Sequence, residues 1–363
     1  MSLPAASNIH LNARFKSRPV TGVERFAWEV GARLATHHLP DLGEIAPEQP
    51  VQGLKGHAWE QFQLPRQLPR GAALFSPCNT GPIAVTRQLV VIHDAAVWDC
   101  PDGFSTTFRH LYRQLLPRLA RRSRAIATVS EFSRQRLAHW LQLPAERIAV
   151  LGNAVGPEFT PGDPAPPTDA KAGGPVLLCV GSLDPRKNLN RLLRAWLDLH
   201  AAGRLPDGAR LHLVGGANPR SFAALDRVED HDSIRWLGRL SDRDLIDQYR
   251  RADAFIFPSL YEGFGLPPLE AMACGCPVLL SHRASLPEVG GPAHDPAGPA
   301  NGTSGAALYF DPESEADIAR AIERFLSLGP DQRAPLRTAA LARAATFRWE
   351  TVAARTAEVL ERI

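Results

Sequence analysis

Residues 258–270, PSLYEGFGLPPLE, carry residue types that can bind a polyhydroxylated ligand. Gly263 and Gly265 allow backbone amides to approach a ligand closely, and the two prolines set the start of a helix. A carboxylate accepts hydrogen bonds without donating, so Glu270 on that helix suits a vicinal diol such as a ribose, and Glu262 in the loop suits sugar hydroxyls. Either glutamate alone is more often a solvated side chain, but the combination with the glycines favours a binding role.

A second candidate lies at residues 181–188, GSLDPRKN, between an expected strand and an expected helix. Arg186 and Lys187 precede the helix, where their charges add to the helix dipole and to its free amides. That arrangement suits a diphosphate. The competing interpretation is a solvated Arg-Lys pair, but ligands of parallel α/β sheets bind at the carboxyl ends of strands, which favours binding.

The third unusual loop follows Ile92 and begins with His93 and Asp94. A buried core histidine is the competing interpretation for His93. The sequence predicts no metal site, because Asp94 and Asp99 are too far apart to form a carboxylate pair at a strand end. The five cysteines have neither CxxC spacing nor a histidine partner, so we expect them to be buried and reduced.

Short apolar runs alternate with helical patterns along the chain, which predicts an α/β protein with parallel sheets and crossover helices. The first half predicts strands at 8–15, 72–76, 88–93, 125–129 and 148–151, with helices at 22–36, 105–121 and 131–141. The second half predicts strands at 176–180, 211–214, 234–237, 254–257, 278–280 and 308–310, with helices at 188–200, 242–251 and 267–274.

The length of 363 residues, with 44% apolar and 22% charged residues, predicts two globular domains of ordinary size. Residues 157–175 hold six prolines without any periodicity, which indicates a linker. We therefore expect an N-terminal domain at 1–160, a linker at 161–173 and a second domain at 174–346.

The run from Glu262 to Glu270, followed by AMACGCPV, resembles the hallmark of the retaining glycosyltransferases of family 4. The resemblance covers nearly the whole chain and implies the GT-B architecture, two facing Rossmann-like doubly wound domains with a cleft between them. In that family the first glutamate and the amides after it meet the donor sugar, and the second glutamate binds the ribose. The resemblance therefore implies a catalytic role for Glu262. It implies donor binding by Gly263, Phe264, Gly265, Leu266 and Glu270.

The same resemblance assigns the donor diphosphate to the loop at 181–188. Lys187 matches the lysine of the family's pattern, while Ser182 stands where the family usually has arginine. We expect Arg186 to supply the second cation and count Arg186 and Lys187 as catalytic, with Ser182 among the donor-binding residues.

The N-terminal half resembles the family as well. TGVER at 21–25 is similar to its glycine loop, which implies that Gly22 lies near the donor phosphates, and TVSEFS at 128–133 is similar to its VSEFS turn. LGNAV at 151–155 stands where the family often has PNGV, so Asn153 matches and Ala154 replaces the glycine. His93 corresponds to a histidine near the donor sugar and acceptor. The helix expected at 347–363 would cross back to the N-terminal domain.

The resemblance implies retention of anomeric configuration without a metal or other cofactor. Its best match is bacterial mannosyltransferases of O-antigen or exopolysaccharide synthesis, which implies a GDP-mannose donor and a polyprenyl-diphosphate-linked or saccharide acceptor. Three alternatives stay open at this point. One is the same enzyme with a UDP-sugar donor. Another is a GT-B-like enzyme without an acceptor, such as a sugar-nucleotide epimerase. The third is a sugar-nucleotide binding protein without catalysis, which only Ser182 supports.

Six arginines and no acidic residue lie between residues 106 and 124, on a helix with leucines at helical spacing. They are Arg109, Arg113, Arg118, Arg121, Arg122 and Arg124. A solvated helix face and a peripheral contact with an anionic inner-membrane surface or a phosphate-bearing acceptor are both open. Few aromatic residues are interleaved with the arginines, which disfavours nucleic acid. The sequence lacks a signal-peptide pattern and a long apolar run, so we expect a cytoplasmic enzyme.

Overall fold

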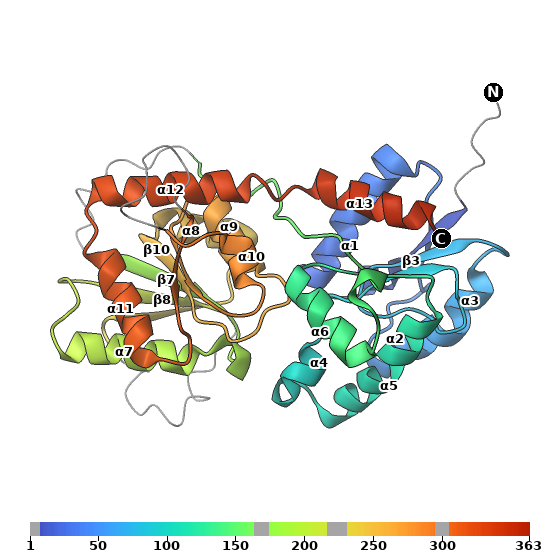
Figure 1. The fold of residues 1–363 in the computed structure, drawn as a ribbon, viewed down its shortest axis with the longest axis horizontal. Coiled ribbons are helices and arrows are strands. Elements are labelled where there is room, and N and C mark those ends of the chain that lie inside the picture. The colour runs from blue at the N-terminus through green and yellow to red at the C-terminus, as the bar shows by residue number, and fades with distance from the viewer. Residues whose placement is uncertain (1–7, 163–173, 216–230, 295–304) are drawn as a thin grey trace. The chain divides into compact units, whose positions relative to one another are not determined.

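The computed structural model describes residues 8–162, 174–215, 231–294 and 305–363. The chain divides into two compact units (Figure 1). Unit 1 comprises residues 8–154 together with Phe347–Ile363, and unit 2 comprises Val155–Thr346. The boundary therefore falls at Ala154, before the expected residue 160, and most of the expected linker, residues 163–173, lies outside the described residues.

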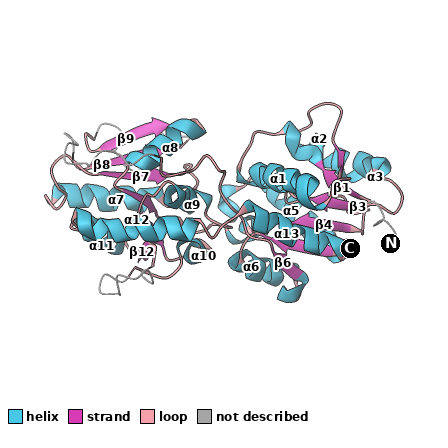
Figure 2. Cartoon of the chain, turned by 90° about the horizontal axis from the view of Figure 1, so that it is seen from above, coloured by secondary structure: helices cyan, strands magenta, loops and turns pink. Residues whose placement is uncertain are grey.

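Unit 1 is built on a six-stranded parallel sheet with the order β2-β1-β3-β4-β5-β6. Its strands are β1 (Ile9–Asn12), β2 (Gly43–Ile45), β3 (Ala73–Ser76), β4 (Gln88–Val91), β5 (Ala125–Thr128) and β6 (Ile148–Val150). Both β3 and β4 are buried along their whole length. Continuous burial is what a parallel sheet requires when helices cover both of its faces, and Figure 2 shows helices on both sides of these strands.

The helices of unit 1 are α1 (Gly22–Arg33), α2 (Gly53–Ala58), α3 (Leu64–Gln67), α4 (Ala96–Asp99), α5 (Thr106–Arg122), α6 (Glu131–Leu141) and α13 (Trp349–Glu361). Short 3-10 or π turns lie at Ala13–Ser17, Leu34–His38, Trp59–Gln63, Pro101–Gly103 and Ala145–Arg147. Helix α13 packs against α1, so the last helix of the chain completes the first unit.

The expected strands of this unit were wrong in two places, and the short helices α2, α3 and α4 were not expected. The strand expected at 8–15 ends at Asn12, because the Asn12 side chain accepts a hydrogen bond from the Arg14 amide and caps a 3-10 turn. Strand β2 was not expected at all, since it has three residues and only Ile45 is buried.

Unit 2 contains a second six-stranded parallel sheet, with the order β12-β11-β10-β7-β8-β9. Its strands are β7 (Val176–Val180), β8 (Arg210–Val214), β9 (Ile234–Gly238), β10 (Ala254–Phe257), β11 (Val278–Ser281) and β12 (Ala307–Phe310). Its helices are α7 (Leu189–Ala201), α8 (Asp242–Arg251), α9 (Leu266–Ala273), α10 (Leu286–Gly290), α11 (Glu315–Leu326) and α12 (Pro330–Ala344), with a 3-10 turn at Pro185–Lys187.

The order of strands in unit 2 places β7 between β10 and β8. The chain runs from β7 to β8 on one side and later reaches β10 on the other, so the direction of winding reverses beside β7. Ligands of doubly wound sheets bind at the carboxyl ends of the strands where this reversal occurs. Residues 181–188 and 258–270 follow β7 and β10, the two strands at this point.

Candidate active site

The loop after β7 and the loop after β10 are joined by hydrogen bonds. The Leu260 amide donates to the Arg186 carbonyl at 2.7 Å. The buried Asn188, at a left-handed φ of 56°, donates from its side chain to the Pro258 carbonyl at 3.1 Å and to the Pro312 carbonyl at 2.7 Å. These bonds hold the two cationic residues of the first loop against the second loop.

Lys187 and Glu262 form an ion pair across these loops, with 2.6 Å between Lys187 Nζ and Glu262 Oε1. Their side chains are 20% and 13% exposed, so the pair is largely shielded from solvent. The Ser259 hydroxyl donates to the same Glu262 oxygen at 2.7 Å. Two residues that are 75 positions apart in sequence thus form one charge-balanced unit at the carboxyl edge of the sheet.

Arg186 is held by Asp184 within its own turn. The Asp184 side chain caps the turn by accepting from the Arg186 amide at 3.0 Å, and it accepts from the Arg186 guanidinium at 3.0 and 2.7 Å. Burial acts to raise the pKa of Asp184, but the hydrogen bonds and charge of Arg186, with the charge of Lys187, outweigh it and lower that pKa. Both cations of the loop are therefore paired with carboxylates in the free protein.

The start of α9 is shaped by Gly265 and two prolines. Gly265 has φ 108°, a left-handed backbone conformation that residues other than glycine rarely adopt. Pro267 and Pro268 have no N–H, so the amides at this helix start belong to Gly265 and Leu266. The Ser285 hydroxyl contacts the Glu262 carbonyl at 2.9 Å and the Phe264 carbonyl at 2.7 Å, which fixes the turn between Glu262 and the helix.

Glu270 lies on α9 and is oriented by Tyr249 of α8. The Tyr249 hydroxyl donates to Glu270 Oε2 at 3.0 Å, and the tyrosine is fully buried. Burial, together with the neighbouring Glu270 charge, raises the pKa of Tyr249 well above its usual value, so the hydroxyl keeps its proton and acts as the donor. Tyr249 and Ser259 were not among the expected site residues. Ser259 lies inside the 258–270 segment, whereas only the tertiary fold shows the contact of Tyr249 with Glu270.

Ser182 is exposed and lies with Lys187 at a narrow crevice between the carboxyl ends of β7 and β8. Gly215 forms the other side of the crevice with φ 144°, and a Cβ at this position would be 1.9 Å from the Gly181 carbonyl oxygen. Only glycine permits this approach of the two strand ends. Gly215 was not expected as a site residue, although it directly follows the strand expected at 211–214, where ligands of such sheets bind.

The other expected residues lie in unit 1. His93 follows β4 and is buried; its Nε2 lies 2.8 Å from the Pro77 carbonyl, and its ring packs edge-on against Phe26. A carbonyl only accepts, so the proton is on Nε2, and burial lowers the pKa of His93 and keeps the ring neutral. Its position at a strand's carboxyl end agrees with the sequence, and its burial agrees with the competing interpretation as well.

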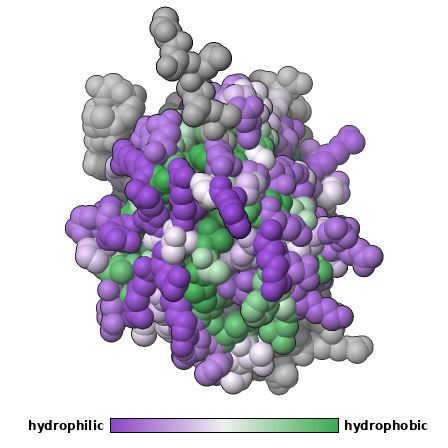
Figure 3. Space-filling model, turned by 90° about the vertical axis from the view of Figure 1, so that its right-hand side faces the viewer, coloured by the Kyte–Doolittle hydropathy of each residue, from purple (hydrophilic) through white to green (hydrophobic). Residues whose placement is uncertain are grey.

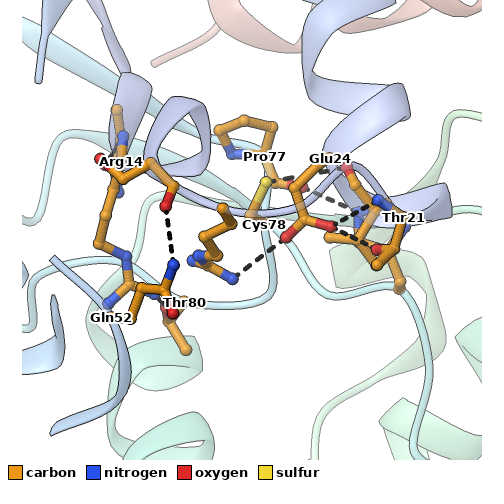
Figure 4. Close-up of polar contacts among 12 residues, drawn as sticks. Arg14, Thr21, Glu24, Gln52, Pro77, Cys78 and Thr80 are labelled. Carbon is orange, nitrogen blue, oxygen red and sulfur yellow. Dashed lines mark hydrogen bonds and ion pairs between the residues drawn. The ribbon is translucent and has the colours of Figure 1, made fainter. Parts of the chain in front are cut away.

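Gly22 is the first residue of α1, which Thr21 and Glu24 cap (Figure 4). The Thr21 amide donates to Glu24 Oε2 at 3.2 Å, and Arg18 lies 3.3 Å from Glu24 Oε1. Asn153 follows β6, is buried, and accepts from the Ala154 amide at 2.9 Å. The structure therefore brings together the expected residues of unit 2 as one group, whereas His93, Gly22 and Asn153 stand at the carboxyl edge of the other sheet.

Within the described ranges no group of three or more histidine, cysteine or acidic side chains is placed to hold a metal ion. Four of the cysteines are buried and Cys100 is partly exposed, all of them free thiols. Burial raises the pKa of Cys274 to about 12, so its thiol is protonated near neutral pH. None of the helices that the structure describes is long and apolar enough to cross a membrane.

The fold defines the class. Over 98% of its length the chain superposes on a sucrose-phosphate synthase from Thermosynechococcus elongatus (TM-score 0.71, 18% identity, 98% of that chain covered). It also superposes on Anabaena HepE in complex with UDP and glucose (TM-score 0.69, 17% identity, 99% of that chain covered). These are GT-B structures, which confirms the expected GT-B fold with two Rossmann-like units.

Sequence comparison gives the family. The model for glycosyl transferases group 1 matches residues 166–343. The chain is 32% identical over 286 residues to O-antigen chain mannosyltransferase B of Escherichia coli, which covers 76% of this chain and 70% of that protein. It is 31% identical over 257 residues to the serotype-specific mannosyltransferase WbdA of Escherichia coli, but spans only 29% of that longer protein. The chain belongs to the group 1 glycosyl transferases, as the resemblance to family 4 predicted, and is a glycosyltransferase enzyme.

Proposed function

We propose that the chain is a retaining, metal-independent hexosyltransferase that moves mannose from GDP-mannose to a lipid-linked or saccharide acceptor in cell-surface polysaccharide synthesis. The observation that carries this proposal is the contact between Lys187 and Glu262. It places a cation beside a carboxylate, and a nucleotide-sugar has its diphosphate bonded directly to its sugar, so the two groups could bind these neighbouring parts of the donor. The names of the O-antigen mannosyltransferases among its relatives, including RfbU of Salmonella typhimurium at 27% identity, favour mannose.

Transfer breaks the bond between the anomeric carbon and the diphosphate oxygen and forms a bond from that carbon to an acceptor hydroxyl. We propose that the acceptor hydroxyl attacks the anomeric carbon from the same face from which the diphosphate departs. The proton of that hydroxyl passes to the departing phosphate oxygen. Lys187 would stabilise the charge that develops on the diphosphate, an effect worth about 10²- to 10³-fold for one preorganised donor.

Donor binding would then exchange partners within the site. In the free protein the Lys187 ammonium is paired with Glu262 at 2.6 Å. A diphosphate placed beside the turn at Pro185–Lys187 attracts this ammonium, and Glu262 turns to the sugar hydroxyls. Arg186 would likewise leave Asp184 and bind the diphosphate. The loop could then supply two cations although Ser182 stands at the usual arginine position.

The remaining groups would bind the rest of the donor. Glu270, oriented by Tyr249, would accept from the ribose hydroxyls, and the amides at the start of α9 would meet the sugar. For Gly22, Asn153 and His93 of unit 1 we propose the donor-binding and catalytic roles that the family resemblance implies.

The test is a thermal-shift panel with GDP-, UDP-, ADP- and dTDP-sugars, followed by product analysis. We expect stabilisation by GDP-mannose, an axial mannosyl product by NMR, and full activity after chelation with EDTA. A UDP-sugar is the second candidate, because HepE, which shares the fold, is solved in complex with UDP-glucose. Preferential stabilisation by UDP-glucose would identify UDP-glucose as the donor in place of GDP-mannose. Loss of activity in EDTA would refute metal independence.

We also propose peripheral contact with anionic lipid through the basic helix α5. Arg118, Arg121 and Arg122 of α5 are exposed, as is Arg124 just after the helix. Arg113 donates to the Val97 carbonyl at 3.2 and 3.1 Å and would stabilise the fold. Replacing Arg121, Arg122 and Arg124 by glutamate should abolish sedimentation with phosphatidylglycerol vesicles and leave binding to neutral vesicles unchanged. Equal sedimentation of the variant would mean that the arginines form a solvated face.

A further inference from the structure

The segment that follows β11, residues 282–286, holds none of the donor-binding or catalytic residues named above. The exposed large apolar side chains of the described residues all belong to unit 1, and Figure 3 shows apolar patches between polar side chains on one face of the molecule. In unit 2, Ser285 and Leu286 of this segment are instead fully buried, at 0% exposure. Side chains buried to this extent act through the residues that they hold.

Ser285 stands at the N-cap of α10, but its hydroxyl does not cap that helix. A serine at this position ordinarily accepts a hydrogen bond from an amide of the first helical turn. Here the hydroxyl lies 2.9 Å from the Glu262 carbonyl and 2.7 Å from the Phe264 carbonyl, and it is the only donor of the three groups. The hydroxyl therefore stabilises the turn between Glu262 and α9 in place of its own helix.

Both carbonyls belong to peptide groups whose N–H comes from a glycine. The Glu262 carbonyl shares its peptide group with the Gly263 amide, and the Phe264 carbonyl shares its own with the Gly265 amide. Both peptide bonds are trans, so each N–H points in the direction opposite to its carbonyl. A hydroxyl that fixes the two carbonyls also fixes the direction of the Gly263 and Gly265 amides, which the wide conformational range of glycine does not fix by itself.

Ser285 is itself held by the structure around it. Its backbone carbonyl accepts from the Glu288 amide at 3.0 Å and from the Val289 amide at 3.3 Å. The next residue, Leu286, packs against the same turn, since a Cβ at Gly265 would be 2.9 Å from Leu286 Cδ2. The hydroxyl is thus presented to the turn from a fixed position.

Ala284, directly before Ser285, has φ 53°, a left-handed backbone conformation that alanine rarely adopts. Asn79 and Asn188 also have positive φ, but asparagine tolerates it because its side chain can bond to nearby backbone. Alanine has no such compensation. Strain of this kind persists where surrounding contacts over-determine the backbone, and it clusters at functional sites. The contacts of Ser285 and Leu286 supply that constraint here.

We propose that Ser285 is a positioning residue for the transfer reaction, and that its hydroxyl aims the Gly263 and Gly265 amides at the donor sugar. The inference rests on the proposed function, in which the amides after Glu262 meet that sugar. Ser285 would not touch the donor itself.

The proposal separates the sugar of the donor from its nucleotide. The diphosphate and the ribose are assigned to Arg186, Lys187 and Glu270, and within the described structure the Ser285 hydroxyl bonds to the carbonyls of residues 262 and 264 and not to these side chains. Loss of the hydroxyl should therefore disturb the sugar and leave nucleotide binding intact.

Ser285→Ala tests this in the full chain, with GDP and GDP-mannose as probes, or UDP and UDP-glucose if the thermal-shift panel selects them. Release of nucleoside diphosphate at saturating donor should fall roughly 10- to 100-fold in kcat, because misplacing a binding group by about 1 Å can cost that much. The Kd of the nucleoside diphosphate, measured by titration calorimetry, should stay within about twofold of wild type. A role in stability alone would lower the urea midpoint and leave kcat of the folded protein unchanged.

Ser281→Ala is the matched control. Ser281 is the last residue of β11, is 0% exposed, and its hydroxyl has no hydrogen-bond partner among the described residues. This variant also removes a buried hydroxyl, but it should leave kcat and the nucleotide Kd unchanged. If Ser285→Ala does not fold, Ser285→Cys, which keeps nearly the same shape with a weaker donor, takes its place with the same expectations.

Three results would overturn the proposal: kcat of Ser285→Ala within about threefold of wild type, a loss of nucleotide affinity as large as the loss of kcat, or an equal loss of kcat in Ser281→Ala. The wild type reports separately on the proposed function. If it binds no nucleotide or nucleotide-sugar and releases no nucleoside diphosphate, the proposed function fails. If it binds and turns over donor while Ser285→Ala does so equally well, only the role of Ser285 fails.

Discussion

Replacing Lys187 with alanine should lower both the turnover and the stability of the protein, because Lys187 contacts Glu262 and is proposed to bind the diphosphate. In Lys187→Ala the leaving diphosphate loses one preorganised cation, so kcat should fall about 10²- to 10³-fold. The variant also leaves the Glu262 carboxylate, 13% exposed, with the Ser259 hydroxyl but without its cation. Hydrogen bonds to charged groups contribute about 1.5–3 kcal/mol, so the free energy of unfolding should fall by about that amount.

The double variant Lys187→Ala/Glu262→Gln distinguishes the two effects. Replacing the unpaired carboxylate with a neutral amide should restore much of the lost stability, because the uncompensated charge is gone. It should not restore turnover, because the diphosphate still lacks its cation and the donor sugar has lost the Glu262 carboxylate as well. Urea unfolding measures the first quantity, and release of nucleoside diphosphate under saturating donor measures the second.

Arg204→Ala provides the control, since Arg204 pairs with Glu323 at the same 2.6 Å in unit 2 but is 57% exposed. An exposed pair contributes about 0–1 kcal/mol, and its loss should leave kcat unchanged. The reasoning would be refuted if Lys187→Ala kept kcat within about threefold of wild type. Recovery of turnover in the double variant would refute it as well, because the lysine would then act only by neutralising Glu262.

The other predictions concern single contacts. Tyr249→Phe removes the hydroxyl that orients Glu270, so the donor KM should rise about tenfold with a smaller change in kcat; an unchanged KM in steady-state kinetics would contradict the ribose assignment. Gly265→Ala places a methyl group at φ 108° and should lower the free energy of unfolding by about 1–2 kcal/mol in urea titration, whereas equal stability would show that the turn relaxes. Because the pKa of His57 is lowered to about 4 in the folded protein, the unfolded chain takes up the proton first as pH falls. Stability from this group is therefore complete above about pH 6.5 and is lost as pH falls towards about 4. His57→Gln should flatten the stability–pH curve in that window, and an unchanged slope would place the titration elsewhere.

Local patterns in the sequence predicted most of the strands and helices that form the two sheets and their crossovers. The structure matches the expected bounds for the strands Val176–Val180 and Ala254–Phe257 and the helices Glu131–Leu141 and Asp242–Arg251, because each is a short apolar run or an amphipathic repeat with a clear boundary. Ser130 and Ser241 cap the two helices by side-chain hydrogen bonds. Strand β2 was not predicted, because a three-residue strand with one buried side chain has no periodicity to detect.

The sequence by itself determined the family and identified the carboxylates and cations of the loops after β7 and β10, because they lie within two short segments. Only the tertiary structure decided their partners. It paired Lys187 with Glu262, placed Arg186 against Asp184, and set Tyr249 against Glu270. These contacts depend on the order of strands in each sheet, which brings loop ends together across long separations in sequence and which local patterns do not encode.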